Sequence, residues 1–307
     1  MYDQVAANKR RSFLLIAAFV VFVALVVGAF DLVLGGGFIG VAIALPLSAG
    51  AAFLSYWKSD SIALAMSRAQ PADPVEYARL HNLVEGLCIA SGLPKPRLYV
   101  VHDEAPNAFA TGRNPQHAAV AVTTGLLQKM NRVELEGVVA HELAHIKNYD
   151  ILISTLAVTL VGVVALLADI GVRLLWWNGG RRRYSSDDNH GGNAALLVLI
   201  PAILLLVLSP FIAKAMQATV GRRREALADM SGIEMTRYPP GLISALEKLR
   251  DDSTVVHSHS RATAHLWIEE PSPVDAREGK VGLLNKINGW FATHPPIEER
   301  IAALREL

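Results

Sequence analysis

This chain of 307 residues has almost no cysteine and no large excess of positive or negative charge. Cys88 is its only cysteine, which excludes a disulfide framework and a zinc site built from thiolates. Any metal ion must therefore be held by histidine and carboxylate side chains. Lysine and arginine number 29 against 28 aspartate and glutamate residues, so the formal net charge is +1. We therefore expect no nucleic acid as the main partner of so nearly neutral a chain.

Hydrophobic residues, in contrast, are abundant and gather in long runs. They make up 52% of the chain, and the mean hydropathy is +0.31, which favours a protein of the lipid bilayer over a soluble globular one. A helix that spans a bilayer takes about 20 apolar residues. Four runs of this size predict four transmembrane helices: Phe13 to Phe30, Leu32 to Leu54, Ile151 to Ala168 and Ala194 to Ala213.

Basic residues predict how these helices are oriented. A basic run at 9–11 precedes the first apolar run, and Lys58 and Arg68 follow the second, so the positive-inside rule predicts that both ends of this hairpin are cytosolic. Both termini and the polar remainder of the chain then lie in the cytosol, with a loop of residues 178–193 outside. Three arginines at 181–183 within that loop oppose the rule.

The polar segments have the patterns of helices joined to a small β-sheet. Asp73 and Pro74 predict the N-cap and first position of a helix that Gly92 ends. Apolar and β-branched residues predict a strand over Arg97 to His102. Further patterns predict a β-hairpin of Asn107 to Arg113 and Ala118 to Thr124, a helix through Glu225 to about Tyr238, and another helix over Leu242 to Arg250. The predicted fold class is mainly α with a small β-sheet: four transmembrane helices plus a cytosolic α+β domain.

A His-Glu-x-x-His sequence, formed by His141, Glu142 and His145, is the most informative motif. Asn131 and Glu134 have the pattern of a capping box ahead of it, so the motif lies on a predicted helix. Residues four apart share one helical face, which lets both imidazoles bind one zinc ion, with Glu142 as the general base of a metalloprotease. The plainer interpretation is a helix with two surface histidines.

A third ligand must come from elsewhere, because position 151, where a metzincin has histidine, holds Ile151. Glu225 is the leading candidate, since it and His145 lie at similar distances from the same predicted membrane face. Asp229, one helical turn after Glu225, is expected to accept a hydrogen bond from a ligand histidine. A rival source of the third ligand is a histidine cluster formed by His257, His259 and His265.

Four ordered motifs resemble those of the HtpX-type membrane metallopeptidases, relatives of the CAAX prenyl endopeptidases and the Oma-type mitochondrial proteases. They are HELAHIKNYD at 141–150, RRREALAD at 222–229, NAFATG at 107–112 and THPPIEER at 293–300. The resemblance covers essentially the whole chain and implies a zincin-like peptidase domain on the cytosolic side of a bacterial inner membrane. It also implies one zinc ion held by His141, His145 and Glu225, with Glu142 as general base.

The resemblance further implies how the chain handles substrate. The expected substrates are damaged or misfolded membrane proteins and other unfolded polypeptides, in overlap with other quality-control proteases. The strand from Asn107 to Gly112 is expected to be a sheet edge that binds substrate as an added strand, through Asn107, Ala108, Phe109 and Ala110. His294 is expected to stabilise the oxyanion; from the residues alone it is equally a histidine that precedes the helix Ile297 to Leu307.

These expectations divide the chain into four parts. They are an N-terminal transmembrane hairpin (1–57), a first part of the peptidase domain (58–150), a second transmembrane hairpin (151–213) and a second part of the peptidase domain (214–307). One alternative is a signal-transducing membrane metallopeptidase that cleaves a specific cytosolic regulator, for which loop 178–193 is too short a sensor. Another is a non-enzymatic membrane scaffold or zinc transporter, which the absence of His and Glu from all the apolar runs disfavours.

Overall fold

The fold combines helices with one small β-sheet, as a computed structural model of the chain shows. The structure describes residues 39–156, 222–254, 266–268 and 296–307, with isolated positions between 7 and 21. The helices among these residues are α2 (Ile39–Met66), α3 (Ala78–Ser91), α4 (Thr124–Lys129), α5 (Arg132–Lys147), α8 (Arg222–Thr236), α9 (Pro239–Asp251) and α11 (Ile297–Arg305). The strands are β1 (Gln70–Pro71), β2 (Arg97–Val101), β3 (Ala108–Gly112) and β4 (Ala118–Thr123), and a 3-10 helix spans Pro115–His117. The prediction of a mainly α fold with a small sheet is confirmed.

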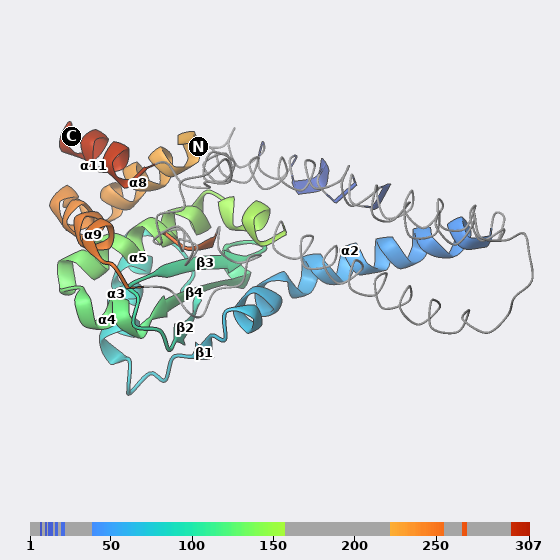
Figure 1. The fold of residues 1–307 in the computed structure, drawn as a ribbon, viewed down its shortest axis with the longest axis horizontal. Helices are drawn as coiled ribbons and strands as arrows, with labels where there is room; N and C mark the ends of the chain where they lie inside the picture. The colour runs from blue at the N-terminus through green and yellow to red at the C-terminus, as the bar shows by residue number, and fades with distance from the viewer. Residues whose placement is uncertain are drawn as a thin grey trace, which may run out of the picture.

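The sheet has the strand order β1-β2-β4-β3, which leaves β3 at one edge. Strand β4 pairs parallel to β2 and antiparallel to β3, and β1 pairs antiparallel to β2. Helix α5 contacts β3 on one side and the helices α8 and α9 on the other, while α2 extends away from the sheet (Figure 1). The hairpin predicted for β3 and β4 is therefore confirmed, and β3 is an edge strand.

Two hydrophobic clusters cover the opposite faces of the sheet. The larger cluster joins the sheet to α3, α5 and α9 and includes Ala108 and Ala110 of β3. The smaller cluster includes Phe109 of β3 and two residues at the end of α2, Ala63 and Leu64. Successive residues of β3 thus enter opposite faces, as the period of two in a strand requires.

Helix α3 begins later than the sequence pattern predicts. Asp73 does cap backbone groups, because its Oδ1 accepts hydrogen bonds from the amides of Val75 at 2.8 Å and Glu76 at 3.0 Å. Tyr77, however, has φ −106° and ψ 34°, which is not a helical conformation. The residues after Asp73 therefore form a turn, and the continuous helix begins at Ala78. Its end is as predicted: Gly92 adopts φ 68°, and its amide donates to the Cys88 carbonyl.

The predicted membrane spans fall mostly outside the described residues. The second overlaps α2, and the third begins within the described residues; only isolated positions of the first are described, and the fourth lies wholly outside the described residues. None of the helices that the structure describes combines the length and the apolar character needed to cross a bilayer. The four-span arrangement therefore stays a prediction.

Candidate metal centre

Helix α5 carries His141, Glu142 and His145, and all of its capping groups are in place. The Asn131 side chain accepts hydrogen bonds from the amides of Val133 and Glu134, while the Glu134 carboxylate accepts one from the Asn131 amide at 2.8 Å. The predicted capping box is thus present. His141 and Glu142 are buried, and the His145 side chain is 14% exposed, so the motif does not lie on a solvated surface helix.

Helix α8 brings Glu225 and Asp229 against α5. The two helices approach closely at Gly232, where a Cβ atom would lie 3.1 Å from the His141 amide nitrogen and 3.2 Å from its Cα. A larger residue at this position would separate the helix backbones. Because Glu225 and Asp229 lie on the same side of α8, this close packing directs both carboxylates at the two histidines.

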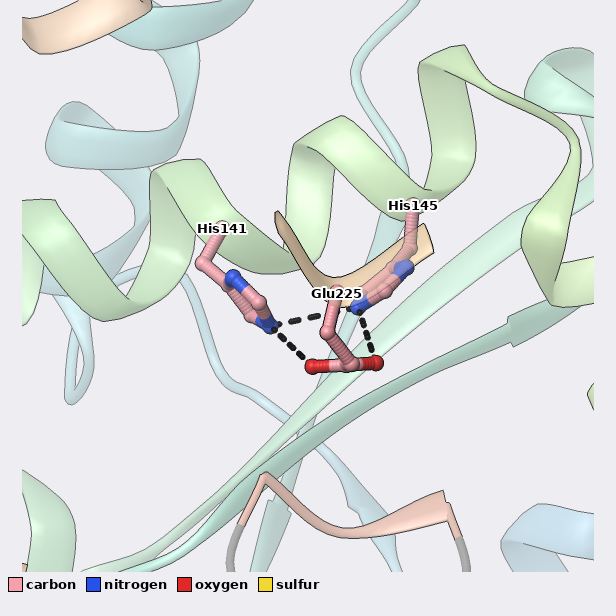
Figure 2. Close-up of side chains that lie close together, drawn as sticks. All are labelled: His141, His145 and Glu225. Carbon is pink, nitrogen blue, oxygen red and sulfur yellow. Dashed lines mark hydrogen bonds and ion pairs between the residues drawn. The ribbon is translucent and has the colours of Figure 1, made fainter. Parts of the chain in front are cut away.

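His141, His145 and Glu225 converge on one point, where both imidazoles descend from α5 toward the Glu225 carboxylate (Figure 2). The two Nε2 atoms lie 3.1 Å apart. Glu225 Oε2 lies 3.6 Å from His141 Nε2, and Glu225 Oε1 lies 3.5 Å from His145 Nε2. A tetrahedral zinc ion with ligands at about 2.0 to 2.1 Å separates any two of them by about 3.3 Å. The two histidine nitrogens, and each nitrogen with the nearer Glu225 oxygen, therefore have about the spacing that a zinc ion requires.

Each histidine is held through its other ring nitrogen by a buried carboxylate. His141 Nδ1 lies 2.8 Å from Asp229 Oδ1, and His145 Nδ1 lies 3.3 Å from Asp150 Oδ2. A carboxylate at Nδ1 favours the proton on that atom, which leaves Nε2 as a free donor to a metal. The predicted position of Asp229 agrees with this geometry. Asp150 is a partner that the sequence reasoning missed.

Arg300 of α11 is a second residue that the sequence reasoning missed. Its guanidinium is buried and donates to both oxygens of Asp229, at 2.6 and 2.9 Å. Its Nη1 also lies 3.9 Å from Glu225 Oε2. Burial raises the pKa of Asp229, but Arg300 and His141 outweigh burial and lower that pKa to about 2. Asp229 is therefore an ionised acceptor.

The electrostatics of the site favour a bound cation. Burial lowers the pKa of His145, but Glu225, Asp150 and Glu142 together raise it to about 9. Glu142 thus lies within electrostatic reach of His145. Four buried carboxylates surround the histidines, and Arg300 is hydrogen-bonded to Asp229 with a longer ion-pair contact to Glu225. Buried carboxylates need compensating charge, which a divalent ion supplies.

Strand β3, whose outer edge is the predicted binding site for substrate, is buried at every residue. Asn107 lies immediately before β3 and is itself buried. Its backbone amide donates a hydrogen bond to Thr123 Oγ1 at 2.9 Å. At the far end, the Gly112 amide donates to Thr155 Oγ1 at 3.1 Å. Near the start, the Ala108 carbonyl accepts from the Ile268 amide at 3.0 Å. The edge is therefore covered by parts of the same chain.

Some of the residues singled out from the sequence lie outside the described part of the chain. They are His294 and the three histidines of the rival ligand cluster, His257, His259 and His265.

The family model and the sequence relatives that match this chain agree on one family. A family model described as "Peptidase family M48" matches residues 74–307. The chain is 41% identical over 309 residues to a "Protease HtpX homolog" of Streptococcus gordonii, covering all of both chains. It is 43% identical over 311 residues to a protein of the same description from Tropheryma whipplei, covering 100% of this chain and 98% of the relative. The crystal structure of S. mikatae Ste24p aligns with a TM-score of 0.48 at 16% identity, over 99% of this chain and 67% of that chain.

Proposed function

Since this chain belongs to peptidase family M48 and is a metalloendopeptidase of the HtpX type, we propose that zinc is its metal and misfolded membrane proteins its substrates. The observation that carries the proposal is the spacing of the donor groups of His141, His145 and Glu225: the two Nε2 atoms lie 3.1 Å apart, and each has a different Glu225 oxygen at 3.5 or 3.6 Å. Two histidines and a glutamate are a ligand set of hydrolytic zinc enzymes. Such an ion supplies Lewis-acid polarisation of the scissile carbonyl and lowers the pKa of a water molecule to about 7.

Glu142 is the general base of the proposed reaction. Its carboxylate takes a proton from the attacking water and returns it to the nitrogen of the leaving amine. Burial of Glu142 beside His145 supports this role, because a carboxylate that is not itself one of the three clustered donors is held next to them. His294 then donates a hydrogen bond to the developing oxyanion.

Asp229, Asp150 and Arg300 orient the ligand histidines. Hydrogen bonds from Nδ1 to Asp229 and Asp150 fix each ring so that its Nε2 points at the common centre. Arg300 holds Asp229 in turn through two hydrogen bonds. A bidentate arginine fixes the plane of the carboxylate as well as its position, so the orientation of His141 depends on α11.

The proposed substrates reach the site as extended chain at the lipid bilayer. Edge strand β3 offers backbone groups to which a substrate segment adds as a further strand along Asn107, Ala108, Phe109 and Ala110, with alternate residues of this stretch making the hydrogen bonds. The four apolar runs, each of about the length that a bilayer needs, support a location in the bacterial inner membrane. Cytosolic cleavage of damaged or misfolded membrane proteins then serves protein quality control.

The proposal is tested by metal analysis and proteolysis on one preparation of the full chain in detergent. We expect one equivalent of zinc and cleavage of casein that a chelator abolishes and added zinc restores. Glu142→Gln should keep the zinc and lose at least about 100-fold in kcat, as expected for removal of a general base. Glu234→Gln, an exposed glutamate on α8, is the matched control and should cleave at the wild-type rate. Cleavage by Glu142→Gln within tenfold of wild type, or cleavage that survives chelation, would contradict the proposal.

A further inference from the structure

The outward backbone groups of β3 can be assigned from a single hydrogen bond. The Thr123 amide donates to the Asn107 carbonyl at 2.9 Å, so this pair faces inward, toward β4. Pairs alternate along an antiparallel ladder, and with Ala108 opposite Val122 the register makes Ala108, Ala110 and Gly112 the residues whose amides and carbonyls face outward. A strand that adds to β3 must bond to these groups.

A short segment of the chain already uses this edge. The Ile268 amide donates to the outward carbonyl of Ala108 at 3.0 Å. The Trp267 ring packs edge-to-face on Phe109, with 4.7 Å between centroids. Leu266, Trp267 and Ile268 are all buried, and Trp267 has no exposed surface.

The same segment places its side chains as an added strand does. Trp267 joins the hydrophobic cluster on the Phe109 face of the sheet. Ile268, the next residue, joins the cluster on the opposite face, which contains Ala108 and much of α5. Side chains on both faces of the sheet and a backbone hydrogen bond to its edge are features of strand addition, although residues 266–268 form a tight bend and not a strand.

We propose that residues 266–268 occupy the β3 edge in place of substrate, and that the site therefore selects extended segments with a large apolar side chain able to replace Trp267 against Phe109. The inference rests on the proposed binding of substrate to β3. A substrate strand needs the same Ala108 carbonyl and the same face of Phe109, so substrate and the 266–268 segment exclude each other.

Residues 266–268 are held on the β3 edge weakly enough for a substrate segment to replace them. Ile268 makes one backbone hydrogen bond to the strand. The Trp267 indole Nε1 is buried and has no hydrogen-bond partner among the described residues. A buried donor without an acceptor opposes the burial of its own ring. An incoming segment whose apolar side chain lacks such a donor fills the same space without that penalty.

Binding of a labelled peptide tests the inference without relying on catalysis. The probe is a fluorescein-labelled peptide with the sequence of residues 263–271, bound to the zinc-loaded full chain carrying Glu142→Gln, in detergent, and followed by anisotropy. Adding Ile268→Pro removes the amide that bonds to Ala108. If the native segment leaves the edge open in about a tenth of molecules, the peptide should bind about tenfold more tightly to this variant. Ile268→Leu keeps the amide and should leave the affinity unchanged.

A second peptide keeps the test decisive if Ile268→Pro fails to fold. A peptide with alanine in place of Trp267 should bind at least about tenfold more weakly than the native sequence to the Glu142→Gln chain, because it cannot fill the space beside Phe109. Equal binding of the two peptides, or no gain with a folded Ile268→Pro variant, would overturn the inference. Discrimination between the peptides without any cleavage of casein by wild type would instead refute only the proposed function.

Discussion

Single carboxylates determine how the two histidines of α5 face the metal position. Asp229 holds His141 and Asp150 holds His145, each at Nδ1. Both rings are thereby fixed with Nε2 pointing inward, 3.1 Å apart. Two nitrogens so close in a buried site repel unless a cation or a proton lies between them. The raised pKa of His145, about 9, reflects the same excess of carboxylate charge that a zinc ion would offset.

A comparison of Glu225 with Asp229 separates a ligand from a residue that only orients one. Glu225→Ala should lower zinc affinity steeply and abolish cleavage, because it removes a donor atom from the set. Asp229→Ala should lower zinc affinity by about 10 to 100-fold, the usual effect of losing a carboxylate behind a ligand histidine. Competition with a chromophoric chelator measures both affinities. Glu234→Ala, on the exposed face of the same helix, should bind zinc as wild type does.

The rival ligand set is tested in the same titration. Replacing His257, His259 and His265 together with alanine should leave zinc affinity unchanged. If the triple variant loses the metal while Glu225→Ala retains a full equivalent, the assignment of the third ligand is wrong.

The residues of the site that were predicted are those connected by helical spacing. His141 and His145 are four apart on α5, as are Glu225 and Asp229 on α8, so a period of 3.6 residues predicts that each pair shares a face. Asp150 follows Tyr149, whose φ of 60° turns the chain after α5 has ended, so no helical spacing relates it to His145. Arg300 reaches His141 across 159 residues of sequence. Only the tertiary packing of α11 predicts that contact.

At the scale of elements, α5 is held in place by close contacts with its neighbours. Its capping residue Glu134 also accepts hydrogen bonds from Lys248 and Ser244 of α9, both at 2.7 Å. Gly137 on α5 packs so closely on α9 that a Cβ would lie 2.7 Å from the Leu242 nitrogen. The histidines are therefore positioned by backbone packing as well as by their own side-chain partners.

Two glycine substitutions test this packing. Gly137→Ala should destabilise the protein by about 1 to 3 kcal/mol, because the new methyl meets backbone atoms that cannot rotate away. Gly86→Ala, in the middle of α3, meets no atom within 4 Å. It should be neutral or stabilising by up to about 1 kcal/mol, since alanine favours a helix over glycine. Differential scanning fluorimetry in detergent compares the two. A larger loss for Gly86→Ala than for Gly137→Ala would refute the close approach of α5 and α9.

The sequence patterns predicted which helices and strands form better than they predicted where a helix begins or what covers the edge of the sheet. Strand patterns predicted β2, β3 and β4, and the helices predicted up to about Tyr238 and over Leu242 to Arg250 are α8 and α9, of which α9 begins three residues earlier, at Pro239. The two-residue strand β1 is too short for any pattern, and it exists because Gln70 and Pro71 pair with β2. The later start of α3 depends on the conformation of Tyr77, which no propensity specifies. The contact of residues 266–268 with β3 is likewise a tertiary contact, which the local sequence around these residues does not predict.

At the scale of the whole molecule, one site is assembled from two distant segments of the chain. Helix α5 supplies the histidines, and α8, beyond residues 157–221, supplies Glu225. If the intervening apolar runs cross a bilayer, they must do so an even number of times, because both contributors lie on the same side. A hairpin of two spans is the simplest arrangement that meets this condition, and it makes loop 178–193 the part on the opposite side.

Cysteine labelling tests this orientation in intact cells. Burial raises the pKa of the Cys88 thiol to about 11, which makes it a poor nucleophile at neutral pH, and Cys88→Ala removes it altogether. In that background, a cysteine at Ser186 should react with a membrane-impermeant maleimide, because the predicted topology has loop 178–193 facing outward. A cysteine at Ser258 should react only after the membrane is permeabilised, because the predicted topology has the segment after α8 in the cytosol. Labelling of Ser258→Cys but not Ser186→Cys in intact cells would invert the orientation, and labelling of both would mean that residues 157–221 do not form a two-span hairpin.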